Sequence, residues 1–378
     1  MIDIVLVKSD SIIHQPSMRD QKIIKSLGKK YSLLVFGWNR EGLERENHQI
    51  QNCLKLFNFR APTGIESYGV LRLVPRLPFF WSWVFIKLCQ VRPKCVHACD
   101  LATVGPCYLY KVLFRKKLVF DIFDRYAMAY IPRNRNLFFR ILYSFINGLE
   151  ETFAKGSDVL INVSDEMLNT FGQKPKQCVT IMNCSNDYMA NSSNAKSTGF
   201  KILFTGHIRT GRGLELVPEI VKNLEGVRVI ITGRVEDRKL LDNVESTPNT
   251  KYLGFLEHQE VLDLEASSDV MMALYDLDLQ TQNKFVMGNK LFEAMMCGIP
   301  IITNVAHEIV NETGCGIVVE YDNPQQIKQA IVTLRDNPEL RKKLGDNGRK
   351  GFLEKYNWGI MEQILYRIYD NLLQGSTK

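Results

Sequence analysis

Long apolar runs are scarce in this chain of 378 residues. The longest, from Pro78 to Ile86, is about half of the roughly 20 residues needed to cross a bilayer. The opening residues, MIDIVLVKSD, lack the basic segment and the longer apolar segment of a signal peptide. We therefore expect no transmembrane helix, a β-strand at the start of the chain, and a cytoplasmic protein.

Disulfide and low-complexity signatures are missing as well. The nine cysteines are odd in number and scattered, unlike the framework of a small secreted domain, which predicts a reducing compartment. Hydrophobic residues make up 45% of the chain and charged residues 24%, as in ordinary globular proteins, so a collagen-like or mucin-like protein is excluded. At roughly 150 residues per domain, the length predicts two to three domains.

Positive charge is unevenly distributed. Residues 1–185 contain 26 Lys and Arg against 15 Asp and Glu, a net charge of +11, whereas residues 186–378 contain 22 against 26, a net charge of −4. A basic half suits a phosphorylated substrate or an anionic membrane surface. No nucleic-acid-binding motif accompanies these charges, so we expect no nucleic-acid partner.

Short β-branched runs alternate with segments of helical spacing in both halves. This alternation predicts two doubly wound, Rossmann-like α/β domains that face one another across a cleft and bind ligands at the carboxyl ends of their strands. We expect an N-terminal domain at 1–185, a polar linker at 186–199, a C-terminal domain at 200–358 and a closing helix at 359–378.

The expected elements can be given by residue range. The strands are Asp3–Val7, Ser32–Phe36, Cys95–Ala98, Leu118–Ile122, Val159–Val163, Val179–Met182, Lys201–Phe204, Arg228–Thr232, Tyr252–Leu253, Asp269–Leu274, Pro300–Thr303 and Ile317–Val319. The helices include Ser17–Leu27, Asn136–Phe153, Leu214–Asn223, Glu257–Ala266, Asn289–Cys297, Pro324–Leu334 and Pro338–Lys355.

A glycine-containing turn, FTGHIRTGRGLELV from Phe204 to Val217, follows the first strand of the second domain. Its glycines allow backbone amides to approach an anion at the start of a helix expected near Gly213. Arg209 and Arg212 lie in the same turn, and guanidinium groups bind phosphate through paired hydrogen bonds. The turn therefore predicts a diphosphate site without a metal, and an ordinary βα turn with surface arginines is the alternative.

A second segment, VMGNKLFEAMMCGIPII from Val286 to Ile302, predicts a helix that starts after Gly288. Lys290 lies in its first turn, where a cation conflicts with the helix dipole unless an anion is bound. Glu293 is three residues further on and can accept hydrogen bonds from two ribose hydroxyls. The alternative is an ordinary capped helix with Glu293 in a salt bridge.

These two segments resemble the donor-binding domain of glycosyltransferase family 4, whose members are retaining enzymes with the GT-B fold. The family combines a glycine-containing turn with a K-L-F-E-A-M-x-C-G-x-P block, which here runs from Lys290 to Pro300. The resemblance covers nearly the whole chain, including CVHACD at Cys95–Asp100 and VFDIFD at Val119–Asp124. The closing Tyr356-Asn357-Trp358 precedes a helix that, in the family, crosses back to the N-terminal domain.

The resemblance implies a hexosyltransferase that uses a UDP-sugar, ahead of a GDP-sugar, and a cell-envelope, polysaccharide or lipid-linked glycan acceptor, with no metal or other cofactor. By position, it implies catalytic roles for Arg212, Lys290 and Asp124. The residues implied to bind the donor nucleotide are Gly206, His207, Arg209, Arg212, Gly288, Asn289, Lys290, Leu291 and Glu293. The residues implied on the acceptor side are Ser11, His14, Asp100 and Asp121.

Three positions depart from the family's pattern. His207 stands where arginine is common, so Arg209 is its expected substitute. Phe285 replaces the first glutamate of a common pair, and Phe123 replaces a histidine of the N-terminal domain. Two rival functions stay open: a nucleotide-sugar epimerase, which can share the fold, and a catalytically silent nucleotide- or glycan-binding subunit, which the departures at Phe123 and Phe285 suggest.

Two further features leave alternatives open. Cys95, His97 and Cys99 share one side of an expected strand, where they could be metal ligands or core residues. Because no fourth ligand follows at a suitable spacing, we expect no metal. Leu71–Leu88 combines tryptophans with basic residues, which suits either an anchor on the inner face of the cytoplasmic membrane or a buried helix. Its apolar residues occur on every side, which favours burial.

Overall fold

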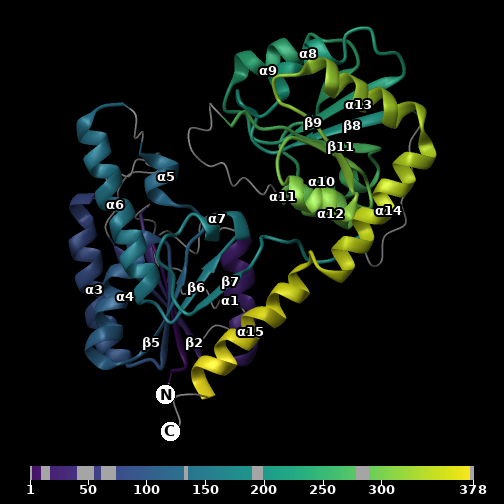
Figure 1. The fold of residues 1–378 in the computed structure, drawn as a ribbon. Coiled ribbons are helices and arrows are strands. Elements are labelled where there is room, and N and C mark those ends of the chain that lie inside the picture. The colour runs from purple at the N-terminus through teal and green to yellow at the C-terminus, as the bar shows by residue number, and fades with distance from the viewer. Residues whose placement is uncertain are drawn as a thin grey trace. The chain divides into compact units, whose positions relative to one another are not determined.

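The computed structural model describes residues 2–9, 18–40, 55–60, 74–131, 135–189, 199–277 and 289–374. The chain divides into two compact units, unit 1 with Met1–Asn183 and Met361–Lys378, and unit 2 with Cys184–Ile360. Each unit has one parallel β-sheet with helices on both faces (Figure 1). None of the helices in the described part of the chain combines the length and apolarity needed to span a membrane.

The sheet of unit 1 has seven strands in the order β3-β2-β1-β4-β5-β6-β7. They are β1 (Ile4–Lys8), β2 (Leu33–Asn39), β3 (Lys55–Arg60), β4 (Cys95–Cys99), β5 (Lys117–Asp121), β6 (Val159–Asn162) and β7 (Gln177–Thr180). In the register of the sheet, Ile4 pairs with Leu33 on one side and with Cys95 on the other. The edge strand β3 was not expected, because a six-residue strand with three apolar residues carries little periodicity.

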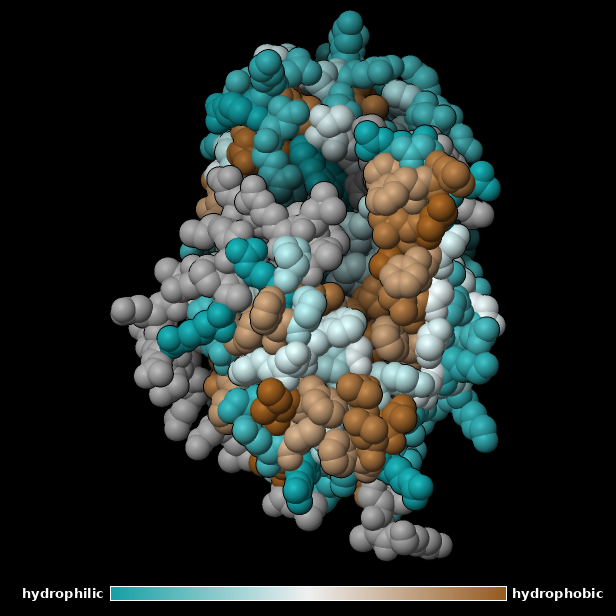
Figure 2. Space-filling view, turned by 90° about the vertical axis from the view of Figure 1, so that its left-hand side faces the viewer, coloured by the Kyte–Doolittle hydropathy of each residue, from teal (hydrophilic) through white to brown (hydrophobic). Residues whose placement is uncertain are grey.

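Helices cover both faces of this sheet. They are α1 (Met18–Lys30), α3 (Leu77–Val91), α4 (Leu101–Phe114), α5 (Tyr126–Tyr130), α6 (Leu137–Gly156), α7 (Asp165–Asn169) and most of α15 (Trp358–Gln374). Helices α3, α4 and α6 share a hydrophobic core with one face, and Figure 2 looks onto this side of the molecule. On the other face, the Tyr31 hydroxyl, just after α1, donates to Asp370 of α15 over 2.8 Å.

The segment expected over Leu71–Leu88 is a short 3₁₀ turn, Val74–Arg76, followed by α3, and its first three residues lie outside the described part. Helix α3 buries Phe80, Val84 and Leu88, whose spacing of four places them on one side of the helix. The expected burial therefore holds for that side of α3.

The sheet of unit 2 has six strands in the order β10-β9-β8-β11-β12-β13. They are β8 (Phe200–Thr205), β9 (Val227–Thr232), β10 (Thr250–Tyr252), β11 (Val270–Ala273), β12 (Ile301–Thr303) and β13 (Gly316–Val318). The helices are α8 (Val217–Ile220), α9 (Arg238–Glu245), α10 (His258–Ala266), α11 (Asn289–Cys297), α12 (His307–Thr313), α13 (Pro324–Asp336) and α14 (Pro338–Glu354).

One expected helix of unit 2 is wrong in form. In place of a single helix over Leu214–Asn223, the structure has a 3₁₀ turn at Leu214–Leu216 and the four-residue α8. Pro218 follows the first residue of α8 and lacks the amide that a continuous helix from Leu214 would use, so the two pieces remain separate.

Candidate nucleotide-binding site

The carboxyl ends of β8 and β9 form the base of a small pocket in unit 2. The Gly206 amide donates to the Thr232 carbonyl oxygen over 3.0 Å, and a Cβ added to Gly233 would lie 1.8 Å from the Gly206 carbonyl oxygen. Both glycines have positive φ, +108° and +139°, so only glycine suits this contact. The pocket is lined by Phe204, Thr205, Gly206, His207, Ile208, Arg212, Leu214, Ile231, Thr232 and Lys290.

The turn from Gly206 to Gly213 is fixed by its own hydrogen bonds. Ile208 forms backbone bonds with the turn that follows β9, and the Gly211 amide donates to the Glu215 carboxylate over 2.5 Å. The residues after Gly213 form only the 3₁₀ turn, so no regular helix presents its first amides to an anion here. The expected form of the helix is therefore wrong, whereas the anion site stays a prediction, and the cations that line the pocket belong to side chains.

Two of these cations lie over one aromatic ring. The Arg212 guanidinium carbon is 4.8 Å, and the Lys290 Nζ is 6.0 Å, from the centre of the Tyr275 ring. Burial and the charge of Arg212 lower the pKa of Lys290 to about 8, and burial lowers the pKa of Arg212. Within the described residues, the buried Arg212 Nε has no hydrogen-bond partner. Two mutually repelling cations and an unsatisfied buried donor form a site that an anion would complete.

Two carboxyl groups lie close to Lys290. Glu293 comes from α11 and the fully buried Glu265 from α10, and their side chains share a hydrogen bond, which requires one carboxyl group to be protonated. Burial and the charge of Glu293 raise the pKa of Glu265 far above its usual range, although Lys290 opposes this shift. The raised pKa favours the protonated form of Glu265 in this pair.

The sequence analysis missed both Tyr275 and Glu265. Tyr275 follows β11 in an apolar run, and its backbone is held by Asn304 through two hydrogen bonds of 2.8 Å. Glu265 lies on the helix before that strand, and no spacing in the sequence relates it to Glu293. Packing of α10 against α11 brings these two carboxyl groups together.

His207 and Arg209 share an acidic partner that the sequence analysis also missed. The His207 Nδ1 lies 2.5 Å from the Glu236 Oε1, and the Arg209 guanidinium lies 3.8 Å from the Glu236 Oε2. Glu236 belongs to the turn after β9, which the backbone bonds of Ile208 hold against the glycine turn. Arg209 is therefore partly neutralised, whereas Arg212 faces Lys290.

The remaining predicted donor residues are distributed around the start of α11. Asn289 is exposed, Leu291 is buried in the core, and Gly288 lies outside the described residues. Among the predicted donor residues, the structure brings Gly206, Arg212 and Lys290 together at one pocket, with His207 at its rim.

The predicted acceptor residues belong to unit 1, and Ser11 and His14 lie outside the described part. Asp121 is fully buried: Arg19 Nη2 donates to its Oδ1 over 2.9 Å, and His97 Nε2 lies 3.3 Å from its Oδ2. Burial raises the pKa of Asp121, but the charges of Arg19 and His97 outweigh it and hold that pKa below its usual range.

His97 is also engaged on its other side. Its Nδ1 lies 2.5 Å from the hydroxyl of Tyr369 on α15, so a chain of polar contacts runs from α1 through β5 and β4 to the closing helix. The neighbouring Asp100, at the end of β4, accepts a hydrogen bond of 2.7 Å from Ser9. These buried contacts give Asp121 and Asp100 a structural role in unit 1.

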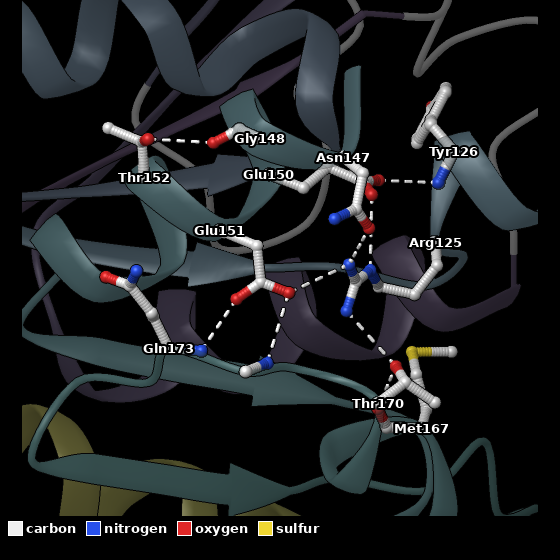
Figure 3. A network of polar contacts seen from close by, with 11 residues as sticks. Arg125, Tyr126, Asn147, Gly148, Glu150, Glu151, Thr152, Met167, Thr170 and Gln173 are labelled. Carbon is white, nitrogen blue, oxygen red and sulfur yellow. Dashed lines mark hydrogen bonds and ion pairs between the residues drawn. The ribbon is translucent and has the colours of Figure 1, made fainter. Parts of the chain in front are cut away.

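Asp124 directly precedes a second buried network (Figure 3). Arg125 donates to Glu150 over 3.2 Å and to Asn147 over 2.6 Å, and both residues belong to α6. It also donates to Thr170 over 3.1 Å. Arg125 therefore fixes the loop of Asp124 against α6.

The fold defined by these units is shared with solved glycosyltransferase structures. Sucrose-phosphate synthase from Thermosynechococcus elongatus aligns with 99% of this chain and 100% of its own, at a TM-score of 0.76 and 14% identity. Anabaena HepE, solved in complex with UDP, aligns with 98% of this chain and 100% of its own, at a TM-score of 0.74 and 13% identity. The predicted fold class is confirmed: the chain has the two doubly wound units of the GT-B fold.

Residues 186–351 match the family model described as glycosyl transferases group 1. An uncharacterized glycosyltransferase of Methanocaldococcus jannaschii is 27% identical over 222 residues, 57% of this chain and 60% of that protein. A GDP-mannose-dependent mannosyltransferase of Corynebacterium glutamicum, which acts on a monoacylated phosphatidylinositol monomannoside, is 26% identical over 44% of this chain and 43% of its own. The capsular polysaccharide biosynthesis glycosyltransferase CapM of Staphylococcus aureus is 26% identical over 47% of each chain. The chain thus spans about half the length of the curated relatives that it matches.

Proposed function

We propose that the protein transfers a sugar from a nucleoside-diphosphate sugar to a hydroxyl group of a glycan acceptor, with retention of anomeric configuration. The observation that carries this proposal is the presence of two cations, Arg212 and Lys290, at one pocket. The buried Nε of Arg212 lacks a hydrogen-bond partner among the described residues. A diphosphate supplies the negative charge and the hydrogen-bond acceptors that this arrangement needs.

The same cations account for catalysis. When the bond between sugar and diphosphate breaks, the leaving diphosphate gains negative charge, and preorganised cations stabilise this charge more in the transition state than in the bound donor. Lys290, on α11, and Arg212, on the glycine turn, would hold the diphosphate without a divalent cation. Glu293 would bind the ribose hydroxyls, and the acceptor hydroxyl would attack from the leaving-group side, with a donor phosphate oxygen taking its proton.

The donor and acceptor classes are also part of the proposal. We favour a UDP-sugar over a GDP-sugar and a hexose as the sugar, with support from the UDP complex of HepE, whereas the corynebacterial relative uses GDP-mannose. A cell-envelope, polysaccharide or lipid-linked acceptor accords with the names of that relative and of CapM. Asp124 is proposed as an acceptor-side catalytic group, because the Arg125 network holds its loop in place.

The experiment is a transfer assay with radiolabelled UDP- and GDP-sugars and extracted glycan and lipid-linked acceptors, run with and without EDTA. We expect label to move to an acceptor and turnover to survive EDTA, because protein cations hold the diphosphate. Conversion of the sugar nucleotide without an acceptor would indicate an epimerase. Donor binding without either reaction would indicate a silent subunit.

A further inference from the structure

Helix α6 presents large apolar side chains to solvent. Leu137, Phe138, Ile141 and Phe145 are 69%, 66%, 62% and 61% exposed, and they span about two turns on one side of the helix. The end of α4 adds a second group of exposed apolar residues, Leu109, Val112, Leu113 and Phe114. Figure 2 shows hydrophobic surface gathered on this side of the molecule.

Most of this exposure lies in unit 1. Of the large apolar residues described as exposed, eleven belong to unit 1, whereas unit 2 has only Tyr188, Phe255 and Leu353. Scattered exposed apolar residues are normal on a soluble protein, but a gathered patch marks a surface that something covers.

The exposed side of α6 is not needed to hold the helix in place. On its inner side, Arg125 binds Glu150 and Asn147, and Glu151 accepts hydrogen bonds from the amides of Gly172 and Gln173 over 3.2 and 2.7 Å (Figure 3). These contacts tie α6 to the loops after β5 and α7. Among the described residues, the polar contacts that position α6 therefore lie on its inner side, away from the outward apolar residues.

The exposed charged side chains of α6 and of the end of α4 are basic, and the nearby Asp158 is paired with Lys111 of α4. Helices α3 and α4 contain no acidic residue, and the acidic residues of α6, Glu150 and Glu151, are both paired with Arg125. The basic residues nearby include Arg135 and Arg140 at the start of α6 and Arg115 at the end of α4, all exposed. Exposed Phe, Leu and Ile residues flanked by arginines suit the interface of an anionic bilayer, where apolar side chains enter the acyl boundary and arginines meet lipid phosphates.

We propose that the outward side of α6, together with the end of α4, is a lipid-binding face that docks unit 1 on an anionic membrane. The sequence analysis assigned a candidate anchor to Leu71–Leu88, but α3 in that segment turns Phe80, Val84 and Leu88 into the core. The lipid-binding face is independent of the nucleotide pocket, which belongs to unit 2.

The test is flotation of the full chain with vesicles of phosphatidylcholine alone or with 30 mol% phosphatidylglycerol. We expect binding to the anionic vesicles only, and a steep loss of binding from low to physiological salt. Changing Phe138, Ile141 and Phe145 together to Ser should lower the partition coefficient at least tenfold. The double variant Arg135→Gln/Arg140→Gln should lower it roughly fivefold for each arginine.

The matched control removes exposed apolar residues from unit 2, in the variant Phe255→Ser/Leu353→Ser, and should bind vesicles like the wild type. Thermal melts should show that all variants remain folded, because every substituted side chain is exposed. Wild-type binding by the triple-Ser variant, or no wild-type binding at low salt, would overturn the proposal. A dimer in light scattering that the triple-Ser variant abolishes, without vesicle binding, would assign the face to a second copy instead.

Discussion

Replacing Arg212 by Ala tests the nucleotide pocket most directly. If Arg212 donates a charged hydrogen bond to the donor diphosphate, its loss costs about 1.5–3 kcal/mol, or about 10- to 150-fold in affinity. Isothermal titration calorimetry with UDP and GDP measures this change. The matched control is Arg238→Ala, which removes an equal charge from an exposed pair with Asp242 in the same unit and should leave affinity unchanged.

The same substitution has two further consequences. Arg212 repels Lys290, so its removal should not lower the melting temperature of the free protein. The pKa of Lys290 should rise above 8, which moves the pH at which the remaining UDP binding is lost to a higher value. Unchanged affinity for both nucleotides, or a fall in melting temperature that matches the loss of affinity, would refute the assignment of Arg212 to the diphosphate.

Three other predictions follow from the polar groups. UDP affinity of the wild type should be highest below pH 8 and fall by about tenfold per pH unit above it, because the neutral amine of Lys290 cannot pair with phosphate; a flat profile from pH 6 to 9.5 would contradict this. The folded chain keeps a proton on Glu265 that the unfolded chain releases above its ordinary pKa, so the free energy of unfolding, measured by urea titration, should fall as pH rises. The variant Glu265→Gln should reduce that fall, and near pH 5 its free energy of unfolding should match that of the wild type. Arg125→Ala should lower the free energy of unfolding by about 3–5 kcal/mol, because Glu150 remains buried without its cation, whereas the exposed Arg140→Ala should change it by less than about 0.5 kcal/mol.

Local patterns in the sequence were enough to predict most of the fold. The alternation of strand and helix periods predicted α1, α6 and the central strands of both sheets, because buried strands and amphipathic helices each impose their own spacing. The glycine turn and the segment starting at Lys290 likewise pointed to one pocket, since the carboxyl ends of parallel strands meet at the same edge. Short elements were less visible, and β3 and the break before α8 were missed.

The partners of the predicted site residues could be read only from the tertiary structure. Three such partners are Tyr275, beneath Arg212 and Lys290, Glu265, which shares a hydrogen bond with Glu293, and Glu236, beside Arg209. Each comes from another element, and no regular spacing in the sequence relates it to the residue that it contacts. The same holds for α6, which has apolar residues on both sides, so that helical spacing could not tell which side faces the sheet. The spacing of apolar residues reflects the geometry of a single helix or strand, so it can be read from the sequence. The burial, the pKa and the exposure of a side chain depend on which elements pack together, and local sequence patterns do not specify that packing.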